Sequence, residues 1–145
     1  MNEGTASIID RKLVGLRVSL NFLRTREGVA LADYLADQTL QLAVERSFQE
    51  AIEACLDIAR RVLTDAGIPL PDRNRDLFAA TVPFGLIPAD ARTRYAEMAS
   101  FRNLLVHEYD RIDPVRVHAA LQHRLDDLQA FAAAVVAHLE GQGPD

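Results

Sequence analysis

LQLAVERSFQEAIEACLDIARRVL, residues 40–63, is the stretch that decides the fold of this chain. Its apolar side chains recur at the spacing of one face of an α-helix. The predicted helix begins at Leu31 or Asp37 and runs to Ala66, because Gly67 and the Pro-Leu-Pro segment after it cannot continue a helix. A face this broad is expected to bury against other helices. Its apolar members are Leu40, Ala43, Val44, Phe48, Ala51, Ile52, Cys55, Leu56, Ala59, Val62 and Leu63.

The same periodicity predicts four further helices. No segment alternates between apolar and polar residues over enough positions to predict a strand. The four helices are predicted at about residues 7–26, 74–82, 88–109 and 113–140. Gly28 ends the first, Pro88 suits the first turn of the fourth, and Asp113-Pro114 forms a good start for the fifth. Helices joined by short connections predict an all-α, antiparallel bundle of four to five helices. We expect one domain over residues 1–145, with its core at about 7–140.

Composition excludes several classes of protein. Hydrophobic residues make up 49% of the 145, as in globular chains, and no apolar run approaches the roughly 20 residues that span a bilayer. The start lacks the plan of a signal peptide, and a lone Cys55 permits neither an internal disulfide nor a cysteine-based zinc site, which predicts a cytoplasmic location. The net charge of −5 argues against a protein that coats nucleic acid non-specifically, but it is compatible with a local pocket that holds one or two phosphates.

Reactive side chains concentrate in residues 102–109, RNLLVHEY. Arg102 offers a fixed cationic fork for phosphate oxygens, and His107 can accept and return a proton near neutral pH. Asn103, four positions before His107, is close enough to orient its ring. Together with Tyr109, these groups could hold a phosphodiester and move a proton on it without a metal.

At about 100° per residue, the polar side chains of this helix share one arc and the apolar ones take the other side. The arc spans about 160°, which is too wide for one small pocket. A second copy of the helix could pool its groups with the first in one cleft on a two-fold axis, so we expect a homodimer. The arc comprises Tyr95, Arg102, Asn103, His107 and Tyr109, and the expected anchors are Met98, Phe101, Leu104 and Leu105.

Simpler interpretations compete with a catalytic one. An arginine and a histidine five positions apart usually mark a solvated helix face, although the fuller octet is much rarer. Glu45 and Glu53 lie eight apart and could pair with Arg102, but surface arginines are the favoured partners. Glu108 is expected at the rim or beside an arginine. The other histidines (118, 123 and 138) have no spacing typical of a metal site and are expected at the surface or satisfied in the core.

The octet resembles the Arg-x-x-x-x-His motif of the HEPN superfamily, and His-x-Tyr at its end looks like the HepT-like toxin branch. No motif position departs from that pattern, and the resemblance covers about residues 7–135. The other landmarks are residues 9–13 (IDRKL), 43–46 (AVER), 51–53 (AIE), 85–87 (GLI) and 101–103 (FRN).

The resemblance implies a dimeric, helical-bundle ribonuclease that needs no metal or cofactor and is the toxin of a toxin–antitoxin pair. Arg102 would bind the scissile phosphate, His107 would transfer the proton, and Asn103 would orient His107 or the phosphate. Tyr109 would be the position that the antitoxin, a minimal nucleotidyltransferase, modifies with AMP. RNA is the implied substrate, and the family suggests tRNA.

Two other functions remain open at this stage. The same bundle could be a non-catalytic module that binds a nucleotide or docks the nucleotidyltransferase, which the acidic overall charge fits somewhat better. A purely structural bundle ranks last, because it leaves the clustering of Arg102, His107 and Tyr109 unexplained.

Overall fold

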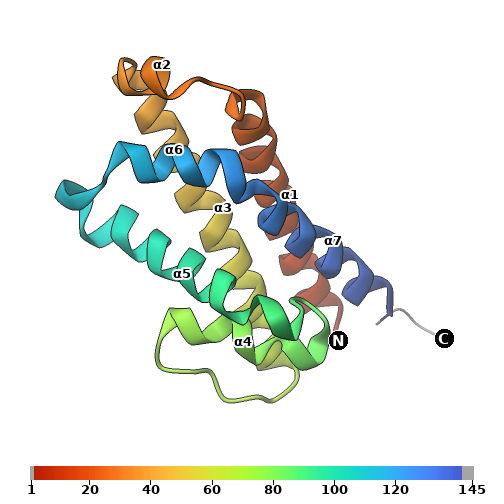
Figure 1. The fold of residues 1–145 in the computed structure, drawn as a ribbon. Coiled ribbons are helices and arrows are strands. Elements are labelled where there is room, and N and C mark those ends of the chain that lie inside the picture. Colours follow the sequence, from red (N-terminus) through yellow and green to blue (C-terminus); the bar gives the residue numbers. More distant parts are fainter. Residues whose placement is uncertain (1, 142–145) are drawn as a thin grey trace.

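The computed structural model describes residues 2–141, and within them the chain forms helices and no strands. The predicted all-helical bundle is therefore confirmed (Figure 1). Seven α-helices follow one another within residues 2–141, with short 3₁₀ turns between some of them. They are α1 (Glu3–Arg26), α2 (Leu31–Leu35), α3 (Gln38–Asp65), α4 (Leu77–Ala80), α5 (Arg92–His107), α6 (Pro114–His123) and α7 (Leu125–Gly141).

Helix α3, which contains the fold-deciding stretch, is the centre of the bundle and contacts every other α-helix. The Asp37 side chain caps its first turn by accepting a hydrogen bond from the Leu40 N–H at 3.0 Å. At the other end Gly67 adopts a left-handed φ of 75°, and the Ile68 N–H returns to the Leu63 carbonyl at 2.9 Å. Of the two predicted starts, Asp37 is therefore correct, and Leu31 begins the separate short helix α2.

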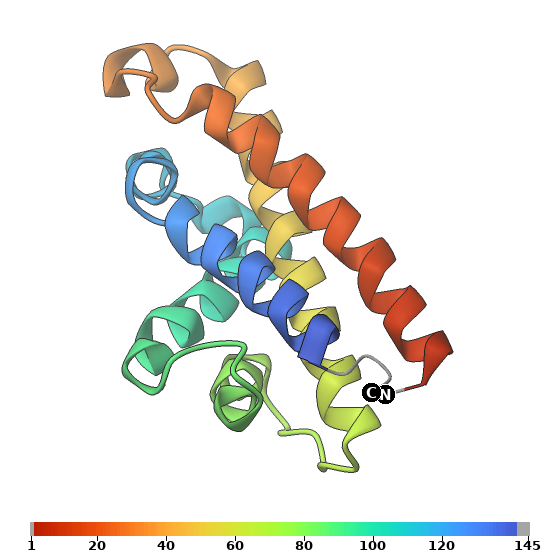
Figure 2. The same cartoon turned by 90° about the vertical axis from the view of Figure 1, so that its right-hand side faces the viewer.

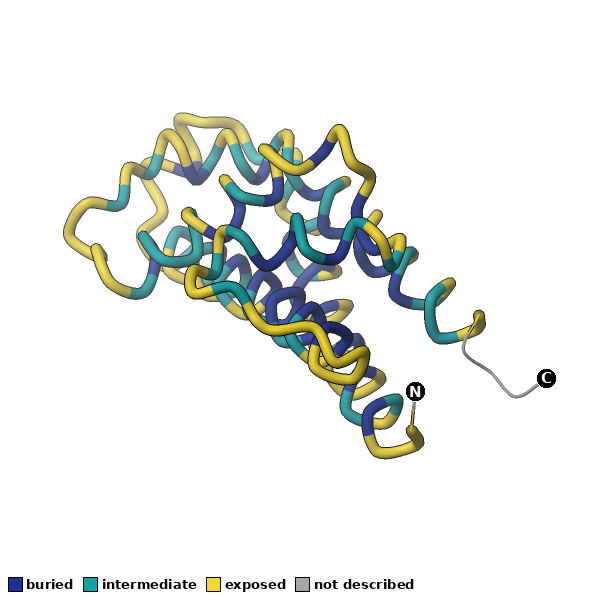
Figure 3. The backbone as a smooth tube through the Cα atoms, turned by 90° about the horizontal axis from the view of Figure 1, so that it is seen from below, coloured by how far each residue is buried: buried dark blue, intermediate teal, exposed yellow. Residues whose placement is uncertain are grey.

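The long helices α1 and α3 run antiparallel side by side, with α7 lying along them (Figure 2). Buried positions gather where the helices face one another, and exposed ones follow the outer sides (Figure 3). One hydrophobic cluster runs from Ile9 on α1 to Val135 on α7. No helix among the described residues is long and apolar enough to cross a membrane.

The predicted helix at 74–82 is shorter and less regular than expected. It consists of a 3₁₀ turn, Asn74–Asp76, followed by α4 and by a second 3₁₀ turn, Val82–Phe84. Gly85, at a φ of 76°, then reverses the chain. Phe78 of α4 fixes this segment against the bundle, with its ring 5.3 Å from Tyr95 and 5.6 Å from Phe131.

The prediction of a single helix over residues 113–140 is wrong, because it breaks at Arg124. The backbone there leaves helical geometry at φ −112° and ψ −4°, between the buried Leu121 and Leu125. The break gives the two halves different neighbours: α6 packs on α2, and α7 packs on α1. Both halves also contact α3.

Helix α5 is also shorter at both ends than predicted. A 3₁₀ turn, Ala89–Ala91, precedes it, and it ends at His107 instead of Tyr109. The residue before a proline disfavours helical geometry, so the chain must leave the helix before Asp113 and Pro114. It does so through a 3₁₀ turn at Tyr109–Arg111. Tyr109 therefore lies outside the helix that carries Arg102 and His107.

Candidate active site

Arg102 lies between α5 and α3 and is held by a carboxylate. Its Nε and Nη2 atoms both donate to Glu53 Oε1, at 3.1 and 3.0 Å. Gln49 donates to the same oxygen at 3.2 Å, and Arg102 Nη1 donates to Asn103 Oδ1 at 3.1 Å. A guanidinium has five N–H groups, so one on each terminal nitrogen stays available to a further acceptor.

The expectation that surface arginines pair with Glu53 is therefore wrong. Helices α3 and α5 pack together, which brings Glu53 onto the Arg102 side chain. Glu45 makes no ion pair with any described residue, and burial raises the pKa of its carboxyl. The two glutamates thus differ in role despite their predicted common face.

A small cavity of about 130 Å³ opens beside the Arg102–Glu53 pair. Leu56, Asp57 and Arg60 of α3 complete its lining. Asp57 is itself paired with Arg60 at 2.9 Å. A space of this size takes a few water molecules at about 30 Å³ each, or a group the size of a phosphate. Arg102 thus faces a small charged cavity.

His107, the last residue of α5, is exposed. Its ring makes no hydrogen bond with the residues that the structure describes. Among the described residues Asn103 makes no hydrogen bond with this ring, and its side-chain oxygen accepts from Arg102. His107 is therefore open to a substrate or to a second chain.

The two tyrosines predicted on the polar arc have opposite environments. Tyr109 is 65% exposed in the turn after α5. Tyr95 is 1% exposed, and its hydroxyl donates to the Asp127 carbonyl at 2.6 Å, so its assignment to the arc is wrong. Burial, followed by the nearby Asp127 charge, raises the pKa of the Tyr95 phenol. The aromatic contacts with Phe78 and Phe131 draw this ring into the core.

The predicted anchors of α5 divide in the same way. Met98 and Leu105 are buried, whereas Phe101 and Leu104 are only half-buried. Phe101 packs its ring at 60° against Phe48, 5.5 Å away. Two apolar side chains therefore keep part of their surface free.

The remaining polar residues have ordinary structural roles. Glu108 pairs with Arg111 at 3.4 Å, as predicted. His118 lies 2.7 Å from the Val29 carbonyl oxygen, His138 packs edge-on against Phe84, and His123 is exposed. No group of three metal-binding side chains gathers within residues 2–141.

The lining of the cavity beside Arg102 does not include His107. The two residues lie five positions apart on the helix, a rotation of about 140°. Arg102 points toward α3, whereas His107 is the last residue of α5. This separation agrees with the wide arc predicted for the polar side chains. One chain therefore presents a positioned guanidinium, an exposed imidazole and an exposed phenol near one end of α5, without a wall that encloses them.

The family model for HepT-like ribonucleases matches residues 16–135 of the sequence. The chain belongs to the HepT-like ribonuclease family. The predicted family resemblance is thereby confirmed, and with it the ribonuclease class of the chain.

Two curated relatives of this HepT-like chain carry nuclease names. The tRNA nuclease HepT of Aphanizomenon flos-aquae is 28% identical over 132 residues, which cover 91% of this chain and 90% of the relative. The mRNA nuclease HepT of Shewanella oneidensis is 29% identical over 106 residues, which cover 73% and 80%. A solved structure of a tri-AMPylated Shewanella oneidensis HEPN toxin in complex with MNT antitoxin is 26% identical, with a TM-score of 0.79 over 94% of this chain and 99% of that one.

Removal of the Glu53 carboxylate from this HepT-like chain tests how firmly Arg102 is held. The pair is largely shielded, with side-chain exposures of 20% for Arg102 and 34% for Glu53. We expect Glu53→Ala to lower the free energy of unfolding by about 1–3 kcal/mol, because it leaves a half-buried guanidinium unpaired. Glu53→Gln should recover part of this loss, since its amide oxygen still accepts a hydrogen bond.

Glu50→Ala is the matched control, measured in the same urea denaturation series. Glu50 pairs with Arg46 at 2.8 Å on the same helix, but these side chains are 50% and 66% exposed. Removing an exposed pair should change stability by less than about 0.5 kcal/mol. Equal effects of the two alanine variants would show that Glu53 does not hold Arg102.

Proposed function

We propose that this chain is an endoribonuclease toxin that cleaves RNA without a metal, with Arg102 and His107 as its catalytic residues. The observation that carries the proposal is the position of an exposed His107 at the end of the helix on which Arg102 is held, in a chain of a ribonuclease family. One helical domain, with its core at about residues 7–140, would provide this scaffold.

The proposed reaction uses the ribose 2′-hydroxyl of the RNA as nucleophile. The free N–H groups of Arg102 bind the non-bridging oxygens of the scissile phosphate and stabilise the charge that builds on them. His107 takes the 2′-hydroxyl proton as the 2′-oxygen attacks phosphorus. The bond to the 5′-oxygen breaks, and that oxygen takes a proton from an imidazolium. The products are a 2′,3′-cyclic phosphate and a 5′-hydroxyl end.

Asn103 and Glu53 act as positioning residues in this scheme. Both contact the Arg102 guanidinium, from α5 and α3 respectively. A guanidinium whose orientation is fixed before substrate binds loses less conformational freedom when a phosphate docks. Asn103 therefore acts on the phosphate through Arg102, rather than on His107.

A homodimer would supply the missing wall of the site. Two copies of α5 related by a two-fold axis would face each other and pool two arginines and two histidines in one cleft. Each scissile phosphate would lie between the Arg102 of one copy and the His107 of the other, and this one imidazole would take the proton from the 2′-hydroxyl and return it to the leaving oxygen. The exposure of His107 at the end of α5 supports this arrangement.

Tyr109 is the proposed site of regulation by a minimal nucleotidyltransferase antitoxin. Its hydroxyl lies on a 65% exposed side chain, directly after the helix that carries His107. Addition of AMP there would bring bulk and negative charge next to the catalytic groups and repel an RNA phosphate. The related toxin solved as a tri-AMPylated chain with MNT antitoxin supports this role.

RNA is the proposed substrate, with tRNA as the first candidate and the cytoplasm as the place of action. The two nuclease relatives are named for tRNA and for mRNA, so both substrates belong in the test. A non-catalytic docking module is the alternative, and the occupation of Arg102 by Glu53 is the observation that favours it.

The purified chain should cleave tRNA, mRNA or both in buffer that contains EDTA, as read on denaturing gels. Cleavage that is lost in EDTA and restored by Mg²⁺ would contradict the metal-independent mechanism. A chain that binds its antitoxin tightly but yields no RNA fragments under any condition would support the docking module instead.

A further inference from the structure

A groove of about 730 Å³ lies between α5 and the corner where α6 meets α7. Its apolar lining includes the half-buried Phe101 and Leu104 of α5, together with Val117 and Ala120 of α6 and Leu128 of α7. An apolar surface that stays open to solvent costs free energy unless something covers it. The groove is thus a candidate binding surface separate from the cavity beside Arg102.

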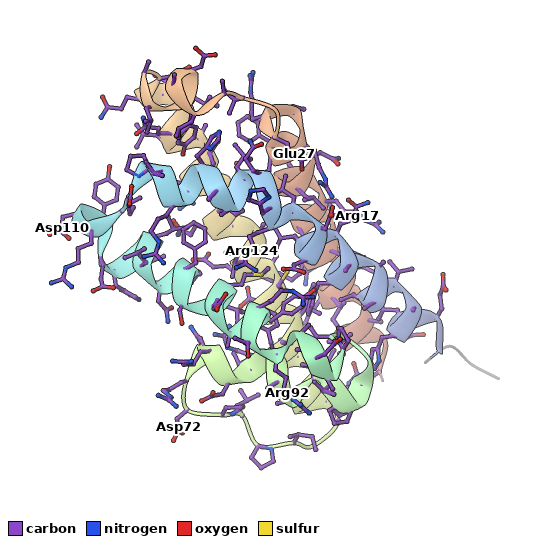
Figure 4. All side chains as sticks on the ribbon, in the orientation of Figure 1. Arg17, Glu27, Asp72, Arg92, Asp110 and Arg124 are labelled. Atoms are coloured by element: carbon purple, nitrogen blue, oxygen red, sulfur yellow. The ribbon has the colours of Figure 1, made fainter. Side chains whose placement is uncertain are left out.

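Positive charge rims this groove in a chain that is acidic overall. Its lining contains Arg75, Arg94, Arg116 and Arg124, against the carboxylates Glu97 and Asp113. Arg124, labelled in Figure 4 between α5 and the α6–α7 corner, pairs with Glu97 at 3.2 Å.

Two of these arginines are free to bind an anion. Arg94 pairs with Asp127 at 3.3 Å, whereas Arg75 and Arg116 are exposed and make no ion pair with any described residue. These two are therefore available to phosphates. Among large molecules, a polyanion with flat apolar faces matches both this charge and the apolar lining.

The groove leads toward the candidate active site. Its lining runs along α5 from Arg94 to Leu104, which at 1.5 Å per residue is about 15 Å. At the far end it includes Asp113 and Arg116, next to the turn that contains Tyr109. A strand leaving His107 could follow it for a few nucleotides.

We propose that this groove binds a single-stranded segment of the substrate RNA that flanks the scissile phosphate, which rests on the proposed ribonuclease function. Bases of the segment pack on the exposed surfaces of Phe101 and Leu104, because every base has a flat apolar face. Arg75 and Arg116 bind its phosphates. The groove thereby contributes affinity for unpaired RNA, while Arg102 and His107 carry out cleavage.

The test measures binding of a fluorescein-labelled, single-stranded RNA by anisotropy in a His107→Ala background, which prevents cleavage. Arg75→Ala/Arg116→Ala should weaken binding by at least about tenfold. It should also make the dependence on salt shallower. The slope of the logarithm of the association constant against the logarithm of the salt concentration should become less negative by about 1.4, since each phosphate contact to single-stranded RNA contributes about 0.7. Arg11→Ala/Arg17→Ala, which removes two exposed arginines of α1 that make no ion pair with a described residue, is the matched control and should change neither quantity.

Cleavage assays separate this proposal from the one it rests on. If the chain with His107 intact never cleaves RNA, the proposed function fails. If it cleaves, and the groove variant (Arg75→Ala/Arg116→Ala) keeps the same KM and the same salt dependence of binding as the Arg11→Ala/Arg17→Ala control, the groove proposal is overturned. It is also overturned if the groove variant changes the oligomeric state by light scattering and leaves RNA affinity unchanged, because the groove would then be an interface between two copies of the chain.

Discussion

Replacement of His107 by alanine is expected to lower kcat/KM for RNA cleavage by about 10²–10⁴-fold, the usual contribution of a general acid–base group. The variant should fold normally, because this side chain is exposed and makes no hydrogen bond with a described residue. His138→Ala, which changes a histidine that packs on Phe84 far along the chain, is the control and should keep full activity.

The companion variant Arg102→Lys separates charge from shape. Lysine keeps the positive charge but lacks the planar fork that holds an acceptor on two nitrogens. We expect cleavage to fall by about 10²-fold or more, since donors aimed at the developing charge each contribute that much. Circular dichroism should show unchanged helix content, and Arg61→Lys on the exposed side of α3 is the matched control. Wild-type rates in both the His107 and the Arg102 variants would reject their catalytic assignment.

Replacement of Tyr109 by phenylalanine is expected to abolish modification by the nucleotidyltransferase antitoxin. After coexpression, the wild-type chain should gain the mass of one or more AMP units, and Tyr109→Phe should gain none. The structure makes this position selective, because the sequence has three tyrosines and the other two, Tyr34 and Tyr95, are 0% and 1% exposed. Burial also raises the pKa of both buried phenols, which disfavours their reactive phenolate forms.

The Tyr109 variant should also escape neutralisation, so that growth arrest persists when the antitoxin is present. Tyr34→Phe serves as the control, because its hydroxyl is buried without a hydrogen-bond partner among the described residues and is unable to reach an enzyme. A Tyr109→Phe chain that still gains AMP and is still neutralised would place the modification elsewhere.

Local sequence patterns predicted the helices whose two sides differ most in polarity. The face of α3 is buried as expected from Val44 to Leu63, and Asp37 caps it. The break at Arg124 escaped prediction because the periodic pattern continues through it, and only the positions of α1 and α2 require the two halves to diverge. Short-range spacing carries no information about such distant neighbours.

The site was predicted in its residues but only partly in its contacts. The octet identified Arg102 and His107, whereas the choice of Glu53 as a partner depends on how α3 packs against α5. Tyr95 was assigned to the polar arc because its helical angle places it on the same stripe as Arg102, whereas its ring packs against Phe78 and Phe131 in the core. The basic groove escaped because Arg75, Arg94, Arg116 and Arg124 come from separate segments that only the fold brings together.

The central claim is that the catalytic groups of two copies meet in one cleft. Arg102→Ala and His107→Ala chains with different affinity tags are coexpressed, and the mixed dimers are isolated through both tags. Each parent dimer should be inactive, whereas the mixed dimer contains one intact guanidinium and one intact imidazole and should recover about half of the wild-type cleavage rate, as expected for one functional pair of two. Mixed dimers that form but remain as inactive as their parents would contradict the account.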